Sequence, residues 1–108
     1  MFARNLAIHL KPNFLTEFTR IFDDEVLPML RKQAGFRDEI TFSISPSGIR
    51  LTAISLWDTK EHAEAYSTTA YPEVRKSLNK VLEGTPKVLV SNVISSTIHS
   101  PSAVAAAD

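Results

Sequence analysis

The order of its hydrophobic periodicities is the feature that most constrains how this chain can fold. Apolar residues alternate with period two over 2–10, follow a helical spacing over 14–33, and alternate again in two stretches across 36–57. A second helical region follows, and a strand-like run rich in Val and Ile covers 87–99. The order is therefore β-α-β-β-α-β. It predicts an α+β fold in which the helices cover one face of a four-stranded, mainly antiparallel sheet.

The same order leaves the other face of the sheet without helices. The stretch 49–57 has apolar residues on both of its faces, with Leu51 and Ala53 on one and Ile54 and Leu56 on the other. That pattern is typical of a strand buried on both sides. A chain of 108 residues forms a single domain with one small core, and oligomerisation helps to stabilise such a chain. We therefore expect a homodimer in which a second copy covers the open face.

Composition excludes several classes of function. Twelve basic and twelve acidic residues are interspersed along the chain, so no basic patch indicates nucleic-acid or membrane-surface binding. The absence of cysteine excludes disulfides, thiolate metal sites and cysteine nucleophiles. The N-terminus enters a strand pattern at once, unlike a signal peptide, and no apolar run approaches the ~20 residues that span a bilayer. We expect a soluble, cytoplasmic protein.

Proline, glycine and asparagine mark the ends of the first helical region. Pro12 cannot donate to a sheet ladder and ends the first strand, and Asn13 is a suitable N-cap for the helix that follows. Pro28 lacks an amide donor and is expected to kink the last turns of this helix. Gly35 suits the left-handed conformation that ends many helices.

The second strand is predicted from an apolar alternation that ends in a turn. Its apolar residues are Phe36, Ile40, Phe42 and Ile44, and polar residues occupy the intervening positions. The segment 45–48, Ser-Pro-Ser-Gly, supplies turn-forming residues and joins this strand to the next one as a hairpin.

The second helical region is predicted to consist of two helices. Asp58 or Thr59 can cap a helix that starts at Lys60 and continues to about Ser67. Pro72 interrupts the pattern and favours a new helix over 72–83. We assign residues 1–100 to one domain and expect the small residues of 101–108 to form a disordered tail.

Three motifs carry a resemblance to a known family. Leu-Lys-Pro-Asn at 10–13 leads into an amphipathic helix, Arg-Lys-Gln-Ala-Gly-Phe at 31–36 links that helix to the second strand, and Ile-Ser-Leu-Trp-Asp at 54–58 ends the third. Over residues 2–99 the chain resembles the antibiotic biosynthesis monooxygenase (ABM) domain family of the dimeric α+β barrel superfamily. The resemblance implies two ferredoxin-like subunits packed sheet against sheet.

The resemblance by itself does not determine an activity. The superfamily includes cofactor-free monooxygenases acting on polycyclic phenols, haem-degrading monooxygenases, isomerases and members without known activity. In the haem-degrading branch an asparagine, a tryptophan and a histidine form the site. Asn5 matches the asparagine and Tyr66 lies where the tryptophan would be, but Arg-Lys-Ser at 75–77 occupies the region of the histidine. Without that iron ligand we expect neither haem nor any other cofactor or metal.

The remaining polar and aromatic residues suggest cofactor-free oxygenation. Such chemistry needs a group that accepts a proton and donors that hold the resulting anion in a water-poor cavity. Asn5 and His9 share one face of the first strand, at a separation of roughly 13 Å. His62 and Tyr66 lie four residues apart and share one face of a helix. These four are the candidate catalytic residues.

Two aromatic residues are the candidates for substrate binding, and each candidate also has a purely structural explanation. Trp57 is a natural aromatic wall, and Tyr71 is the second candidate. Asn5 can instead satisfy a backbone group at the sheet edge, and His9 can make a polar contact in the dimer interface. His62 can be a solvated helix residue, and the two tyrosines, Tyr66 and Tyr71, can be core or interface aromatics.

Two functions from different classes therefore remain. The first is a cofactor-independent monooxygenase-like enzyme acting on a small aromatic or quinol-type compound. The second is a non-catalytic homodimer that binds a small apolar ligand or has a stress or regulatory role. A cavity on which Asn5, His9 and either Tyr66 or His62 converge would favour the enzyme, and a cavity filled by Leu and Phe side chains would favour the second function.

Overall fold

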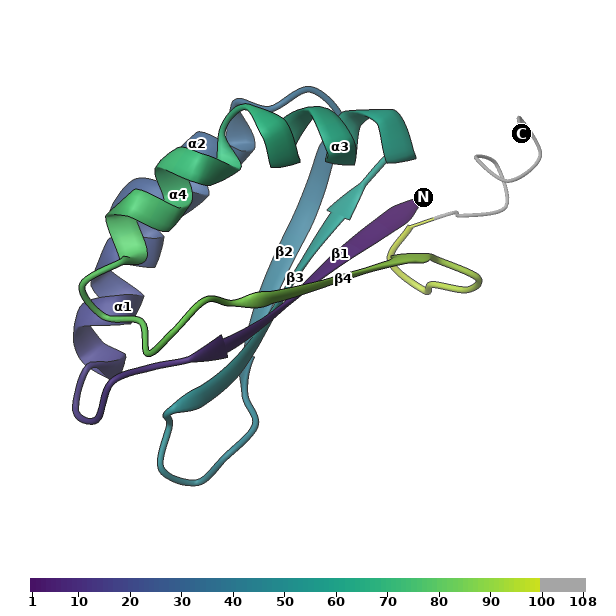
Figure 1. The fold of residues 1–108 in the computed structure, drawn as a ribbon. Coiled ribbons are helices and arrows are strands. Elements are labelled where there is room, and N and C mark those ends of the chain that lie inside the picture. The colour runs from purple at the N-terminus through teal and green to yellow at the C-terminus, as the bar shows by residue number, and fades with distance from the viewer. Residues whose placement is uncertain (100–108) are drawn as a thin grey trace.

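The computed structural model describes residues 1–99. Strands and helices follow one another in the order predicted from the sequence (Figure 1). The elements are β1 (Phe2–His9), α1 (Leu15–Ile21), the π-helical segment η1 (Phe22–Val26), α2 (Leu27–Arg31), β2 (Phe36–Ser43), β3 (Arg50–Trp57), α3 (Lys60–Thr68), α4 (Tyr71–Leu78) and β4 (Lys87–Asn92). The predicted tail at 101–108 lies outside the described residues.

The four strands form one antiparallel sheet in the order β2-β3-β1-β4. Each helical region connects two strands that are separated in the sheet by a third one, which is the ferredoxin-like topology. The helices lie together on one side of the sheet (Figure 1). This confirms the predicted α+β fold and its four-stranded antiparallel sheet.

The core lies between the sheet and the helices. From β1 it receives Leu6 and Ile8, and the residue after the strand adds Leu10, which completes the apolar face that the alternation predicts. Trp57 at the end of β3 is fully buried. The helices and the segment after α4 contribute further buried side chains, among them Phe18, Ile21, Phe22, Val26, Leu30, Tyr66, Val74, Leu78 and Val81.

The first helical region is divided differently from the prediction. A π-helical segment precedes Pro28, and the Leu27 N–H donates to the Phe22 carbonyl five residues earlier. A proline has no N–H with which to continue the regular helical ladder, and the wider turn accommodates this defect before α2 begins. The predicted N-cap was also wrong. Asn13 has a left-handed backbone with φ 69°, and Phe14 occupies the cap position.

A β-bulge in β2 changes which side chains face the helices. Phe36 pairs with Trp57 and Asp38 with the preceding residue of β3, so Arg37 is an extra residue in the ladder. Phe36 therefore contacts Trp57 on the helix side, with ring centroids 5.6 Å apart. The sequence had predicted that Phe36 would share a face with Ile40, which instead lies on the open face. A bulge interrupts the period of two on which that prediction relied.

The open face and β4 carry exposed apolar side chains. Ile40 and Phe42 of β2 are 52% and 46% exposed, and Leu89 of β4 is 68% exposed. All six residues of β4 are exposed, and the strand ends at Asn92 instead of continuing to His99 as predicted. The apolar face that the order of elements left without helices is therefore present in the structure.

The other turns and helix ends follow the sequence more closely. Thr59 caps α3, since its hydroxyl accepts a hydrogen bond from the His62 N–H at 3.2 Å. Gly35 and Gly48 adopt positive φ angles of 79° and 72° in the two turns where they were expected. The helix α4 begins at Tyr71 and ends at Leu78, five residues before the predicted end at Glu83.

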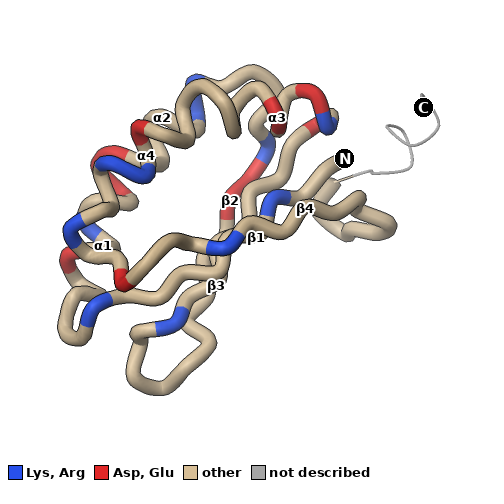
Figure 2. Tube along the Cα trace, in the orientation of Figure 1, with Lys and Arg blue, Asp and Glu red and all other residues tan. Residues whose placement is uncertain are grey.

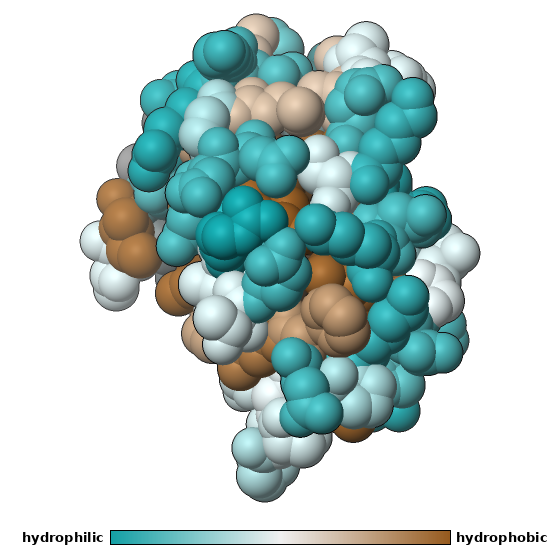
Figure 3. Space-filling model, turned by 90° about the vertical axis from the view of Figure 1, so that its left-hand side faces the viewer, coloured by the Kyte–Doolittle hydropathy of each residue, from teal (hydrophilic) through white to brown (hydrophobic). Residues whose placement is uncertain are grey.

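The charges are mixed over the molecule (Figure 2). Viewed from the side of α1 and α4, the surface is mainly hydrophilic, with smaller apolar areas between the polar side chains (Figure 3).

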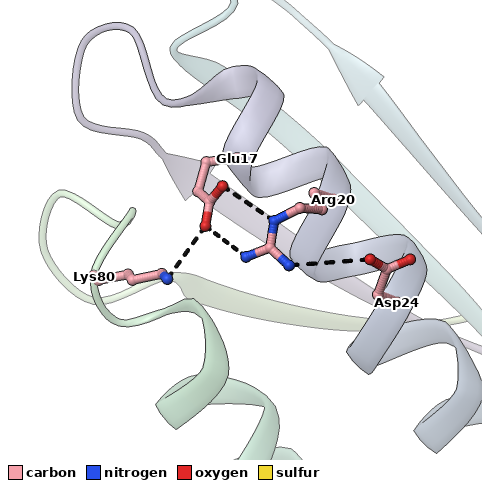
Figure 4. Close-up of polar contacts among 4 residues, drawn as sticks. All are labelled: Glu17, Arg20, Asp24 and Lys80. Carbon is pink, nitrogen blue, oxygen red and sulfur yellow. Dashed lines mark hydrogen bonds and ion pairs between the residues drawn. The ribbon is translucent and has the colours of Figure 1, made fainter.

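An ion-pair network links α1 to the segment after α4 (Figure 4). Glu17 pairs with Arg20 at 2.6 Å and with Lys80 at 3.2 Å, and these hydrogen bonds lower the pKa of Glu17 to about 2. In the described part of the chain, no helix has the length and apolarity needed to cross a bilayer.

Candidate functional site

A row of polar side chains crosses the helix-covered face of the sheet. Arg4 of β1 pairs with Ser55 of β3, and Ser55 pairs in turn with Glu39 of β2. Directly paired residues point to the same face, so the three side chains form one line. Because adjacent strands lie about 4.8 Å apart, the line spans roughly 10 Å between the outer two Cα atoms. The flanking positions on this face of β1 and β3, such as Leu6 and Ala53, are apolar and buried.

This polar row forms one wall of a small cavity between the sheet and the helices. The cavity has a volume of about 30 Å³. Apart from the row itself, its lining is mostly apolar and comes from the sheet, η1, α2, α3 and α4: Leu6, Phe22, Val26, Leu30, Ala53, Tyr66 and Val74. A space of this size has room for water, and not for an aromatic ring, until a side chain moves.

Arg4 is a buried cation that has no acidic partner among residues 1–99. Its residue is 5% exposed, and its Nη2 donates one hydrogen bond, to the Ser67 hydroxyl at 3.3 Å. The guanidinium lies over two aromatic rings, 5.2 Å from the centroid of Tyr66 and 4.3 Å from that of Tyr71. Burial lowers the pKa of Arg4, but a guanidinium stays protonated in proteins. Arg4 therefore retains both a positive charge and N–H donors for a bound molecule.

The aromatic residues around Arg4 form a continuous stack. Trp57 lies on Tyr66 with ring centroids 4.9 Å apart, and Tyr66 lies beside Tyr71 at 6.0 Å. Trp57 does not line the cavity. Its Nε1–H donates to the Ser55 hydroxyl at 2.9 Å, which leaves the Ser55 O–H free to donate into the cavity. Trp57 thus positions one side chain of the polar row and supports a second aromatic ring.

The two tyrosines act as hydrogen-bond donors at neutral pH. Burial raises the pKa of Tyr66 to about 12, and the charge of Arg4 opposes this shift only in part. Burial also raises the pKa of Tyr71, again against the charge of Arg4. Both phenols therefore keep their protons, and neither accepts a proton from a substrate.

Glu39 is the titratable group of the row that can accept a proton. Its side chain is half-buried, and burial raises the pKa of the carboxyl above its ordinary value of 4.5. The Thr41 hydroxyl donates a hydrogen bond to the same carboxyl and opposes the shift. A carboxylate with a raised pKa is a stronger base than an ordinary one, which suits it to general-base chemistry.

A larger groove lies next to the cavity and shares two lining residues with it. The groove has a volume of about 290 Å³ and runs between α1, η1 and the β2–β3 side of the sheet. Phe22 and Glu39 line both spaces. Phe22 is the first residue of the π-helical segment, and such segments are frequent at functional sites. A movement of the Phe22 ring would join the two spaces into one of the size that small-molecule sites have.

Asn5 and His9 lie on the other face of the sheet. Both alternate with Arg4 and the apolar residues of β1, so they point away from the cavity. The Asn5 side-chain amide donates to the Leu89 carbonyl of β4 at 3.3 Å, which is the structural role considered from the sequence. His9 lines a separate surface depression of about 400 Å³, together with residues such as Arg50.

His62 does not share a space with Tyr66, although both lie on α3. Its Nδ1 lies 2.7 Å from Oδ1 of Asp58, and the ring packs against the turn after α2. A Cβ at Gly35 would lie 2.2 Å from Asp58 Oδ1 and 2.4 Å from His62 Nδ1, so this close contact requires glycine. The four candidate catalytic residues therefore do not converge on one cavity.

The candidates predicted from the sequence do not include three residues of the site: Arg4, Ser55 and Glu39. A signal for two of them was present. Arg4 falls on the same alternation as Leu6, and Ser55 falls between Ala53 and Trp57 on the buried side of β3. A polar residue at a position predicted to face the core is costly unless it has a partner or a function. The position of Glu39 depends on the bulge and has no comparable signal.

The arrangement can bind and deprotonate a small acidic molecule. It offers a buried cation, hydroxyl donors and a carboxyl group with a raised pKa, in surroundings that are otherwise apolar. Among residues 1–99, no cluster of three or more His, Asp or Glu side chains could hold a metal ion.

Comparisons with solved structures identify the fold. A chain from Bordetella bronchiseptica that is provisionally named an antibiotic biosynthesis monooxygenase matches with a TM-score of 0.74 and 14% identity, over 87% of this chain and 97% of that one. A monooxygenase from the gene ActVA-Orf6 of Streptomyces coelicolor, in complex with the ligand Nanaomycin D, matches with a TM-score of 0.73 and 16% identity, over 92% of each chain. SnoaB, a cofactor-independent oxygenase from Streptomyces nogalater, matches with a TM-score of 0.72 and 11% identity, over 91% of this chain and 97% of that one.

At such identities the comparisons establish the fold and leave the chemistry to the residues of this chain. The sequence matches no protein-family model, and no curated protein matches it significantly. The fold is that of structures named as antibiotic biosynthesis monooxygenases, as the sequence motifs had predicted.

Proposed function

We propose that this protein is a cofactor-independent monooxygenase acting on a small phenol or quinol in the cavity below α3 and α4. One observation carries the proposal: an unpaired buried cation, Arg4, and a carboxyl with a raised pKa, Glu39, lie at the two ends of one polar row in an apolar cavity. Proton removal and stabilisation of the resulting anion are the two tasks that oxygenation without a cofactor requires of a protein.

The steps balance with dioxygen as the oxidant. Glu39 takes the hydroxyl proton of a phenol, and the phenolate charge lies beside Arg4. The electron pair of the phenolate attacks dioxygen from the para carbon, and the peroxide formed takes the proton from Glu39. Loss of the C–H proton at that carbon and cleavage of the O–O bond release water and leave a carbonyl. One phenol and one dioxygen give one quinone and one water.

Two of the solved structures support the choice of reaction. SnoaB is named a cofactor-independent oxygenase, and the Streptomyces coelicolor monooxygenase was solved with Nanaomycin D. The aromatic stack in this chain supplies a surface suited to flat ligands, because Tyr66 faces the cavity and is itself held by Trp57.

The small volume of the cavity favours a second candidate function. As it stands, a space of about 30 Å³ does not hold an aromatic ring. If the Phe22 ring stays in place, the protein is better described as a non-catalytic binding or regulatory protein, with Arg4 anchoring a small polar ligand.

Oxygen uptake distinguishes the two candidates. The purified full chain, treated with a chelator, would be mixed with a set of anthrones, naphthols and phenols that carry hydrogen at the para carbon, in an oxygen-electrode cell, with ¹⁸O₂ used to trace the new carbonyl oxygen. Quinone formation with one ¹⁸O per product and a rate above the protein-free control supports the enzyme. Tight binding of these compounds with no rate above the control would support the second candidate.

We also propose that a second copy of the chain covers the open face. Exposed Ile40, Phe42 and Leu89, together with half-buried Ile54 and Leu56, make that face largely apolar. An apolar sheet face of this kind on a chain of 108 residues is typical of an interface. The cavity lies on the opposite side of the sheet, so each copy would hold its own site.

A further inference from the structure

Beside the cavity, two guanidinium groups approach the same tyrosine. Arg4 of β1 has its guanidinium 4.3 Å from the ring centroid of Tyr71. Arg75 lies one turn further along α4, and its charge, like that of Arg4, lowers the pKa of the Tyr71 hydroxyl, against the larger effect of burial. Tyr71 therefore has cationic groups around its hydroxyl from two different elements.

Neither of these two cations belongs to an ion pair in the described part of the chain. Glu39 lines the same cavity at the other end of the polar row, and within residues 1–99 it forms no ion pair with Arg4. Buried or partly buried charges without a partner are costly, and proteins retain them where a ligand supplies the opposite charge.

The hydrogen-bonding groups at this position are also unsatisfied. Arg4 and Arg75 both approach the Tyr71 hydroxyl closely enough to lower its pKa. Neither contact has hydrogen-bond geometry, and within residues 1–99 the Tyr71 hydroxyl and Nε of Arg75 are buried without a hydrogen-bond partner. Arg4 is 5% exposed and uses one N–H, toward Ser67, of the five that a guanidinium carries. Three side chains thus present free donors to one place, and two of them are positively charged.

We infer that Arg4, Tyr71 and Arg75 form an anion site for a carboxylate group carried by the aromatic ligand. A carboxylate accepts two parallel hydrogen bonds from a guanidinium and a third from a phenol, and its charge compensates the two cations. The aromatic part of such a ligand would extend along Tyr66 toward Phe22 and the groove. The aromatic nature of the ligand rests on the proposed function, whereas binding of the anion does not.

The test compares benzoate with benzamide, which has nearly the same shape and no charge. Binding to the full chain would be measured by calorimetry, and the melting temperature would be followed in parallel. We expect benzoate to bind and to raise the melting temperature, and both benzamide and inorganic phosphate to have no effect at the same concentration. Equal binding of benzoate and benzamide would overturn the inference, and stronger binding of phosphate would assign the site to a free inorganic anion instead.

Two variants on α4 make the test specific. Arg75→Gln is expected to weaken benzoate binding roughly tenfold or more, the effect of losing a charge-assisted hydrogen bond. Lys76→Gln removes the same charge from an exposed neighbour that pairs with Glu73, and it is expected to change benzoate affinity less than twofold. Equal weakening by both variants would reduce the effect to general electrostatics and contradict the site.

Further variants cover the case in which Arg75→Gln does not fold. Arg75→Lys keeps the charge and should retain part of the affinity, and Tyr71→Phe removes only the unpaired hydroxyl and should weaken benzoate binding. Unchanged benzoate affinity in Tyr71→Phe would contradict the site. If benzoate binds as expected and no phenol is oxidised, the proposed function fails and the anion site stands. If phenols are oxidised and benzoate does not bind, only the anion site fails.

Discussion

The two faces of the sheet differ in where they place their polar residues. On the helix-covered face, Arg4 and Ser55 are 5% and 8% exposed and lie in a row with Glu39 among apolar side chains. On the open face, Asn5 and His9 lie among side chains that are partly exposed, and Asn5 satisfies a backbone carbonyl of the edge strand.

Polar residues on the two faces differ in what their presence costs the folded protein. A polar group that water can reach costs little and needs no function to explain it. A buried charge without a partner lowers stability, so its presence is explained best by a ligand or a reaction. By this reasoning we propose that the chemistry takes place on the helix-covered face and that the open face serves association.

The largest effect is expected from Glu39→Gln. Loss of a general base lowers turnover by roughly 10²- to 10⁴-fold. The control is Asp38→Asn, which alters the neighbouring carboxylate on the open face and should leave turnover within about twofold. Turnover of the two variants would be measured as the rate of oxygen uptake. An equal loss of turnover in both would contradict the assignment of the chemistry to the helix-covered face.

The pH dependence of Glu39 provides a second readout of the same residue. Its pKa in the folded protein is raised above 4.5, so turnover should increase as the pH rises through that pKa and the carboxylate forms. Stability should change in the opposite direction. The stability that the Glu39 carboxyl contributes is fully present below its pKa in the unfolded chain, and it is lost as the pH rises through its pKa in the folded protein. Glu39→Gln should therefore melt higher than the parent protein near pH 7, and the difference should vanish in acid. A difference that does not depend on pH would show that Glu39 is not held in the shifted state.

Arg4→Met is expected to lower turnover by roughly 10²- to 10³-fold, the effect of losing the group that stabilises an anion. Since methionine fills similar space without a buried charge, the melting temperature should stay the same or rise. Arg50→Met, which removes an exposed arginine from β3, is the matched control and should leave turnover unchanged. A large fall in the melting temperature of Arg4→Met would make Arg4 a structural residue.

Leu56→Glu tests the open face. In a homodimer across this face it would bury a carboxylate without a partner in each copy, at a cost of roughly 3 kcal/mol or more. Light scattering after size exclusion should show a monomer for Leu56→Glu and a dimer for Ala65→Glu, which places the same charge on the exposed side of α3. A folded Leu56→Glu dimer would assign the interface to another surface.

The smallest effects are expected from Asn5→Ala and His9→Ala. Because both residues lie outside the cavity, turnover should remain within about twofold of the parent protein, and Asn5→Ala should cost about 1 kcal/mol of stability for one exposed hydrogen bond. Turnover of both variants would be measured as steady-state rates, and their stability by thermal melting. A loss of turnover comparable to that of Arg4→Met would move the chemistry to the open face.

Much of the fold was predictable because it depends on local patterns. The alternation of Leu6, Ile8 and Leu10 gave the buried face of β1, and Thr59 and Gly35 marked helix ends by their local chemistry. The π-helical segment was not predictable, since Pro28 indicates that the ladder is interrupted but not where the interruption is absorbed.

The candidate site was predicted less well because it depends on how the elements pack. Tyr66 and Tyr71 were identified as candidates, but their common neighbour Arg4 comes from a strand more than sixty residues away. His62 and Tyr66 share a helix face by spacing, yet the first reaches Asp58 and the second reaches the cavity. Periodicity gives the side of an element on which a residue lies, and tertiary contacts decide its surroundings.

The bulge at Arg37 determines which side chains of β2 face the helices. Counted from Phe36, the alternation of β2 after the bulge is shifted by that one extra residue. Deletion of Arg37 would remove the bulge and leave a regular ladder, in which Glu39 still pairs with Ser55 and faces the helices. Related chains that are one residue shorter in this stretch would thus keep both the fold and the polar row. A carboxyl residue paired with Ser55 in the sheet register is therefore a better marker of a shared site than the length of the segment between Gly35 and Glu39.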